Sequence, residues 1–238
     1  MTLAEILAAL FPHGHAVVAR DGLVTGAGPF AGGRIHVVGV DGDTPLGVEG
    51  ALTLSRAVLD AVRAGDRAPI LVAVDSDSQR MSRRDELLGL NECLAHLAKA
   101  LLLADRSGHP TIGLIYGHSA AGAFIATALA TRVLAALPGA NPSVMDLPSV
   151  ARVTKLPLAQ LEEMAQSTPV FAPGLDNMVA TGAVHAVLDP GLSLEKQIRA
   201  LIDEMPLEDV RDRLGAERGG RPVAGTVAAA VAEQARLG

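Results

Sequence analysis

Residues Thr111 to Ala130 read TIGLIYGHSAAGAFIATALA, and this stretch decides the fold. Its first part, Thr111 to Tyr116, is rich in β-forming residues and follows a proline. Gly117-His118-Ser119 then interrupts the pattern, and an alanine-rich, helix-forming run begins near Ala120. The stretch predicts a strand, a tight turn and the start of a helix. Because the first N–H groups of a helix have no partner inside it, a turn of small residues can present them to a developing negative charge.

Other interpretations of this stretch stay open at the level of sequence. The small residues also suit a buried helix that packs closely on a sheet, with no chemical role. A serine-hydrolase elbow is a second alternative, since Gly117-His118-Ser119 begins a G-x-S-x-G pattern, although its fifth position is Ala121. A membrane span is excluded, because Gly, His and Ser interrupt the middle of the run and Arg132 follows it.

The hydrolase alternative needs an acid and a base after the nucleophile Ser119. Asp176 or Asp189 could be the acid, and His185 is the one histidine after Ser119. His185 precedes Asp189, however, and lies in a strand-like run where a catalytic loop is expected. The chain order therefore disfavours a hydrolase.

The composition limits the class of protein and its partners. The 238 residues are 49% hydrophobic but only 2% aromatic, which predicts a core of Ala, Leu, Val and Ile in layered helices and sheets. A net charge of −6 disfavours nucleic acid and anionic membranes as partners. The single cysteine, Cys93, allows neither a disulfide framework nor a cysteine zinc site, so we expect a cytoplasmic protein.

The order of predicted elements indicates an α/β fold. The start has the T-x-x-E spacing of a capped helix and no basic signal-peptide region. Strands and helices then alternate, which implies a mainly parallel sheet with its functional loops at the strand carboxyl ends. The polar loops 75–84 and 117–119 should lie on that edge. The expected strands are 16–20, 23–25, 34–40, 70–74, 111–116, 132–137, 143–145 and 184–188, and the expected helices include 48–64, 85–104, 148–154, 158–166, 175–181, 192–202 and 207–214.

Two further segments affect the domain organisation. The glycine-rich residues 26–33 have G-x-G-x-x-x-G spacing and are followed by a strand, so they predict a hairpin turn and not a dinucleotide loop. Residues 172–174 predict a turn. We expect one domain over residues 1–215, followed by a loop and an alanine-rich helix over residues 216–238.

The loop after the strand 70–74 carries charged candidates. Asp75 and Asp77 could reach a magnesium ion, but Asx turns at strand ends are commoner, and we expect no metal. Ser82-x-x-Asp85 predicts a helix cap, which would put Arg83 and Arg84 beside Arg80 in or near a first helical turn. Because the helix dipole disfavours cations there, these arginines either pair with local carboxylates or bind phosphates or an acidic carrier protein.

Three segments together resemble a known family. They read QRMSRRDELLGLNE at residues 79–92, YGHSAAGAF at 116–124 and NPSVMDLP at 141–148. In combination they resemble the crotonase-like superfamily, and within it the carboxyltransferase-type subunits that act on acyl thioesters. They are most similar to the gamma subunits of malonate decarboxylases. The resemblance covers roughly residues 10–215 and implies a crotonase-like fold with a helical C-terminal region.

The resemblance also implies a reaction and partners. A malonyl thioester on the phosphopantetheine-type arm of an acyl carrier subunit would lose CO₂, and the enolate would be held by backbone N–H groups. The catalytic positions carried over are Ala120, Ala121 and Gly122, with His118 and Ser119 beside them as hydrogen-bond donors or proton relays. Gly117, Arg80, Arg83 and Arg84 would bind substrate. A beta-type subunit would complete the site in a hetero-oligomer.

This chain departs from the family pattern in one respect. Where transcarboxylases often have paired glycines, it has Ala120-Ala121-Gly122, so the backbone approaches a ligand less freely. None of the three lysines lies in a Met-Lys-Met context, so the chain does not look like a biotin carrier and should hold no covalent cofactor. A scaffold paralogue without activity remains an alternative.

Overall fold

The computed structural model describes residues 1–167 and 173–237, and its centre is a mostly parallel sheet. The strand order is β1-β2-β3-β4-β5-β6-β8, and β7 pairs with the end of β5. The first three strands form an antiparallel meander, whereas the remaining pairs are parallel. The α/β prediction is therefore confirmed. The strands are β1 Val18–Arg20, β2 Leu23–Phe30, β3 Gly33–Val40, β4 Ile70–Ser76, β5 Thr111–Ala120, β6 Val133–Ala136, β7 Asn141–Ser143 and β8 Ala186–Val187.

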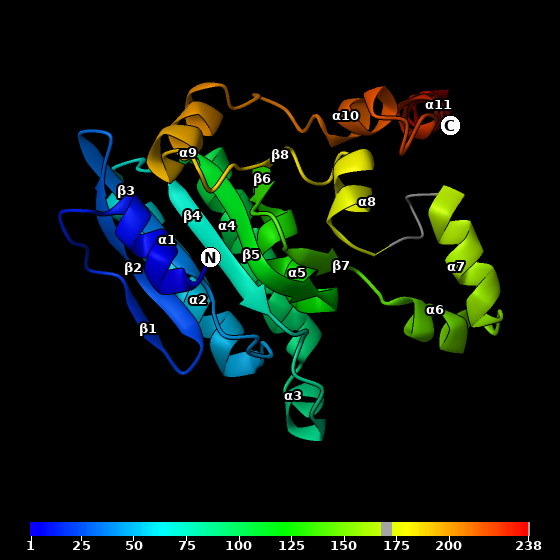
Figure 1. Cartoon of the computed structure of the whole chain (residues 1–238), viewed down its shortest axis with the longest axis horizontal. Coiled ribbons are helices and arrows are strands. Elements are labelled where there is room, and N and C mark those ends of the chain that lie inside the picture. Colours follow the sequence, from blue (N-terminus) through cyan, green and yellow to red (C-terminus); the bar gives the residue numbers. More distant parts are fainter. Residues whose placement is uncertain (168–172, 238) are drawn as a thin grey trace.

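Helices cover both faces of the sheet (Figure 1). Along β4 the side chains alternate: Val72 and Val74 pack with α2 and α4, while Leu71 and Ala73 pack with α1 and α9. Figure 1 shows α3 projecting below the sheet, and α6 and α7 lying to the right of it. The helices are α1 Leu3–Leu10, α2 Val48–Ala64, α3 Arg83–Leu87, α4 Leu90–Arg106, α5 Ala121–Ala126, the 3₁₀ turn η1 Ala128–Ala130, α6 Leu147–Thr154, α7 Leu158–Ser167, α8 Leu175–Ala180, α9 Leu194–Asp203, α10 Arg211–Glu217 and α11 Ala224–Leu237.

Local capping signals set the start of α1 and the end of α2, as predicted. Thr2 Oγ1 accepts the N–H of Glu5, and Glu5 accepts the N–H of Thr2, which completes the capping box of α1. Helix α2 ends at Ala64, where Gly65 takes the left-handed conformation with φ 67°. Both predictions are confirmed.

The central prediction needs a correction, because β5 does not stop at Tyr116. It continues to Ala120, so Gly117, His118 and Ser119 belong to the strand and not to a turn. Residues 118–120 pair with β7, a partner more than twenty positions away that local propensity cannot reveal. The following helix is also shorter than predicted. It ends at Ala126, and the hydroxyl of Thr127 binds the carbonyl of Ala123 at 2.6 Å.

The predicted helix 85–104 is in fact two helices. Gly89 has φ 78° and separates α3 from α4. Ser82 caps α3 as predicted, by accepting the N–H of Asp85 at 3.1 Å. The break lets α3 stand apart from α4, as Figure 1 shows.

Smaller differences affect the hairpin and the later strands. Strand β2 runs through Gly26 and Gly28, so the predicted hairpin is present but its turn is shorter than residues 26–33. Strand β7 ends at Ser143, so the strand predicted at 143–145 lies two residues too late. The turn predicted at 172–174 begins outside the described residues.

The domain boundary expected after residue 215 falls inside α10, and the division remains a prediction. Among residues 1–167 and 173–237, no helix combines the length and the apolar character needed to cross a bilayer.

Candidate active site

A cleft of about 500 Å³ opens at the carboxyl edge of the sheet, where β4, β5 and β7 end. Its lining comes from residues within 77–81, 118–121 and 143–153. The prediction that the loop after β4 and the end of β5 share one edge is thus confirmed. Ligands of open α/β sheets commonly bind at such an edge.

Ala120 and Ala121 line the cleft at the junction of β5 and α5. Ala120 is extended, with φ −128° and ψ 155°, and no side chain caps the helix. Ala121 has φ 49°, a left-handed conformation that a residue with a Cβ rarely adopts. As the first residue of α5, Ala121 has no acceptor for its N–H inside the helix. The junction therefore holds a strained backbone turn against the cleft.

Gly122 differs from its two neighbours. Its N–H donates to Oε1 of Gln79 at 2.8 Å, so a side chain of the protein already uses this donor. In this structure Gly122 thus has no free N–H to offer a ligand, and its catalytic role stays a prediction. Gln79 itself lines the cleft, and its amide ties the loop after β4 to the start of α5.

Gly117 was expected to bind substrate but does not line the cleft. A Cβ at this position would lie 2.1 Å from Oδ1 of Asp75. That oxygen accepts the backbone N–H of His118 at 2.9 Å, so glycine is needed for the close approach of Asp75. Gly117 and Asp75 therefore position the end of β5, and the substrate-binding role of Gly117 stays a prediction.

His118 lines the cleft and has a carboxylate partner. Its Nδ1 lies 3.2 Å from Oδ1 of Asp43, in the loop between β3 and α2. Within the described part of the chain, His118, Asp43 and Asp77 form the one group whose potential ligand atoms all lie within 4.8 Å of one another. Both carboxylates are exposed to water, which satisfies them, so the trio does not by itself define a metal site.

Ser119 faces away from the cleft. Side chains alternate along a strand, and the flanking residues His118 and Ala120 line the cleft while Ser119 does not. Its hydroxyl is buried and has no hydrogen-bond partner among the described residues. A serine nucleophile needs a base within hydrogen-bond reach and an open path to substrate. Ser119 is therefore unsuited to be the nucleophile of a hydrolase, and its role as a hydrogen-bond donor or proton relay stays a prediction.

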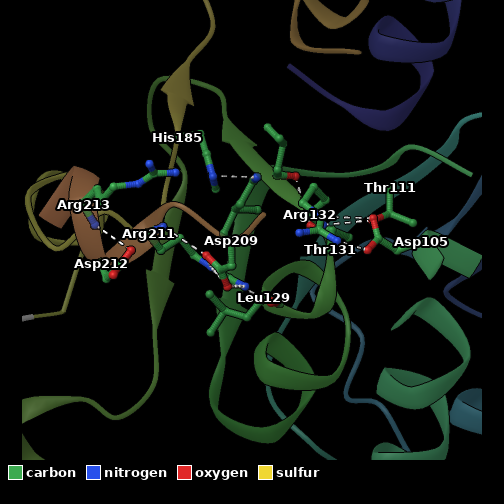
Figure 2. Close-up of polar contacts among 12 residues, drawn as sticks. Asp105, Thr111, Leu129, Thr131, Arg132, His185, Asp209, Arg211, Asp212 and Arg213 are labelled. Atoms are coloured by element: carbon green, nitrogen blue, oxygen red, sulfur yellow. Dashed lines mark hydrogen bonds and ion pairs between the residues drawn. The ribbon is translucent and has the colours of Figure 1, made fainter. Parts of the chain in front are cut away.

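His185 is equally unsuited to be the base of a hydrolase. Figure 2 shows its ring against β6, where Nδ1 accepts the backbone N–H of Leu134 at 3.1 Å. Burial, together with a smaller effect of the nearby guanidinium of Arg211, lowers the pKa of His185 to about 4. Arg211 in turn pairs with Asp209 and donates to the carbonyl of Leu129 (Figure 2). The hydrolase alternative fails on both residues.

Two of the three loop arginines are occupied by carboxylates of the protein. Arg80 donates through Nε and Nη2 to the buried carboxylate of Asp85, at 2.8 and 2.9 Å, and also reaches Glu49. Nη2 of Arg84 lies 2.5 Å from Oε1 of Glu49. This contact is the main reason that the pKa of Glu49 falls to about 2. The hydrogen bond from Arg80 likewise holds the pKa of Asp85 well below its usual range. These contacts match the local-compensation alternative, and they tie α3 and the loop before it to α2. The substrate-binding role of Arg80 and Arg84 stays a prediction.

Arg83 is the exception in that loop. It is exposed, and no ion pair of its side chain occurs within residues 1–167 and 173–237. None of the three arginines lines the cleft. The cleft instead contains Arg152 of α6, which sequence reasoning missed.

The other residues that sequence reasoning missed are Gln79, Ser143, Asp146 and Ser149. Gln79 lies in the first of the segments that carried the family resemblance, so a signal for it was present. Ser143 and Asp146 lie in the third of those segments, so a signal was present for them as well, whereas Ser149 lies just outside it. All three come to the cleft because β7 pairs with the end of β5, a pairing that no local pattern indicates.

Comparison with known proteins gives results that agree with the geometry. The chain matches the sequence profile "Malonate decarboxylase gamma subunit" over residues 42–235. It is similar to the malonyl-S-ACP:biotin-protein carboxyltransferase MADD of Malonomonas rubra, with 29% identity over 209 residues that cover 79% of this chain and 72% of that protein.

Solved structures share the fold. A Pseudomonas malonate decarboxylase hetero-tetramer in complex with coenzyme A contains a chain with a TM-score of 0.81 and 23% identity, covering 96% of this chain and 97% of that one. A transcarboxylase 12S chain has a TM-score of 0.69 and 16% identity, and the match covers 86% of this chain and 40% of that one. The chain shares the fold of these structures, as the sequence predicted. On the strength of the profile match, the chain belongs to the malonate decarboxylase gamma subunit family.

Proposed function

We propose that the cleft decarboxylates a malonyl thioester carried on the phosphopantetheine-type arm of an acyl carrier subunit. Loss of CO₂ leaves an enolate, whose charge collects on the thioester oxygen. The backbone N–H groups of Ala120 and Ala121 stabilise that oxygen from the β5–α5 junction. Donors fixed in this way contribute roughly 2.7–4 kcal/mol each to lowering the barrier when water is excluded. The conformation of Ala121, at φ 49° on the cleft lining, is the observation that carries the proposal.

The cleft is incomplete without a second subunit. Its wall includes the apolar side chains of Met81, Val144, Met145 and Val153, which are exposed by 82, 45, 44 and 69%. An enolate site needs exclusion of water, and exposed apolar side chains around one cleft mark a surface for a partner. A beta-type subunit would cover this wall. A solved Pseudomonas relative is named as an MdcD-MdcE hetero-dimer, which supports a partner of this kind.

The proposed function also includes an acyl carrier as partner and the cytoplasm as compartment. The relative from Malonomonas rubra is named for malonyl-S-ACP, which supports a carrier-borne thioester as substrate. Arg83, which has no ion pair among the residues that the structure describes, is available to meet an acidic carrier. We place the complex in the cytoplasm, on the basis of the single cysteine Cys93.

Reconstitution tests this function. The chain is purified alone and together with its beta-type subunit, and each preparation receives malonyl-loaded carrier labelled in the free carboxyl group. The complex should release labelled CO₂ and form the acetyl thioester, while the chain alone should be nearly inactive. An assembled complex that binds carrier without releasing CO₂ would instead support the scaffold alternative.

A further inference from the structure

His118 is held in place by two carboxylates. Its backbone N–H donates to Oδ1 of Asp75 at 2.9 Å, which fixes the end of β5. Its ring Nδ1 lies 3.2 Å from Oδ1 of Asp43, and the side chain is 35% exposed at the cleft. The imidazole is therefore anchored on one side and open to the cleft on the other.

The partner of Nδ1 determines what the other ring nitrogen can do. A carboxylate only accepts hydrogen bonds, so the contact with Asp43 requires the proton of His118 on Nδ1. Nε2 is then free to gain and lose a proton. In the imidazolium form, Nε2–H can donate a proton. His118 lines the cleft beside Ala120 and Ala121, so this proton is close to the proposed oxyanion donors.

We propose that His118 protonates the enolate carbon and that Asp43 is the positioning residue that orients its ring. The proposal rests on the decarboxylation proposed above. When the bond between the methylene carbon and the carboxylate breaks, CO₂ leaves and the electron pair forms the enolate. The enolate carbon then takes the proton of His118 Nε2, which gives the methyl group of the acetyl thioester. The neutral imidazole regains a proton from water.

Other charged groups surround the same ring, and the test must separate them from Asp43. Asp77 follows β4 and has a carboxylate oxygen within 4.8 Å of a ring nitrogen of His118, but among the described residues only Asp43 is hydrogen-bonded to the ring. Asp146 and Arg152 line the cleft from the segment after β7. Asp43→Asn and Asp77→Asn each remove one negative charge near His118, so they form a matched pair. Asp43 has φ 53°, a conformation that Asn adopts readily.

The experiment uses the complex with the beta-type subunit and two measurements. The first is CO₂ release from malonyl-loaded carrier. The second is exchange of methyl protons of acetyl-loaded carrier in D₂O, which requires proton transfer but no C–C cleavage. His118→Gln should lower both rates about 100-fold with little change in KM, since a general acid contributes on the order of 10²–10⁴-fold. His96→Gln, at an exposed position on α4, should leave both rates unchanged.

Asp43→Asn should slow both reactions about tenfold, because it weakens the hydrogen bond that orients the ring of His118. Asp77→Asn should slow them less, because it removes a nearby charge and no hydrogen bond to the ring. Wild-type rates for His118→Gln would overturn the proton-donor role, even while CO₂ release by the native complex upheld the proposed function. Equal losses for Asp43→Asn and Asp77→Asn would overturn the positioning role. If His118→Gln does not co-purify with the partner, His118→Asn provides the same comparison.

Discussion

At the scale of single residues, Ala121 carries the strain of the site. The left-handed conformation raises the energy of a residue with a Cβ by about 1–2 kcal/mol, and glycine avoids this strain. Glycine, however, gains more conformational entropy in the unfolded chain, which offsets part of that difference. Ala121→Gly should therefore leave the free energy of unfolding unchanged or raise it by up to about 1 kcal/mol.

Ala121→Val gives the opposite test, because a β-branched residue tolerates φ 49° poorly. Its free energy of unfolding should fall by more than about 1 kcal/mol, as measured by urea denaturation. A valine variant as stable as the native chain would show that the junction is relaxed and not strained.

The histidine beside β6 links stability to pH. The pKa of His185 is lowered from 6.5 to about 4 in the fold, mainly by burial, so the unfolded chain binds more protons between these values. Its contribution to stability is complete above pH 6.5 and is lost as the pH falls towards 4. His185→Gln should therefore flatten the change in urea midpoint between pH 6.5 and 4. An unchanged slope in that variant would mean that His185 is protonated in the folded chain.

At the scale of elements, the loop between β4 and α4 divides its arginines between structure and binding. Arg80 neutralises the buried carboxylate of Asp85, which also accepts the N–H of Val48 at 2.9 Å. Arg80→Met should lower the urea midpoint clearly, because it leaves Asp85 buried without its cation. Arg83 is the first residue of α3 and is exposed, so Arg83→Met should leave the urea midpoint unchanged.

Binding should show the reverse order for the two arginines. Arg83→Glu should raise the KM for carrier-bound substrate at unchanged stability, since it would repel an acidic carrier. If KM for the carrier stays the same, Arg83 has no part in docking it.

Elements set by local signals were predictable from the sequence, and elements set by distant partners were not. The capping box of α1 and the terminal glycine of α2 are local, and the sequence indicated the start of α1 and the end of α2. The last residues of β5 are extended because β7 and the end of β4 pair with them, whereas a Gly-His-Ser run alone favours a turn. The family resemblance identified the right region. It could not show that Gly122 donates to Gln79, or that Arg80 and Arg84 pair with Asp85 and Glu49, because these partners meet only in the folded chain.

At the scale of the whole molecule, Arg218 joins the end of α10 to α8 and to the segment that leads into β8. The guanidinium of Arg218 donates to the carbonyls of Val179, Val184 and His185 at 2.9, 2.7 and 2.8 Å. Arg218→Ala should cost about 2 kcal/mol of stability and expose α10 to proteolysis. Arg213→Ala, an exposed neighbour on α10 (Figure 2), should do neither. Equal protease resistance in both variants would contradict this anchoring role.

The claim that the cleft binds the reacting thioester is tested most directly by narrowing it without straining the backbone. Ala120 has an extended conformation that suits valine, so Ala120→Val adds two methyl groups to the cleft alone. Ala19→Val adds the same groups on the exposed strand β1. In complexes with the beta-type subunit, release of labelled CO₂ from malonyl-loaded carrier should fall at least tenfold for Ala120→Val, on the order of 1.4 kcal/mol in the barrier, and stay unchanged for Ala19→Val. Equal CO₂ release by both variants would contradict the account.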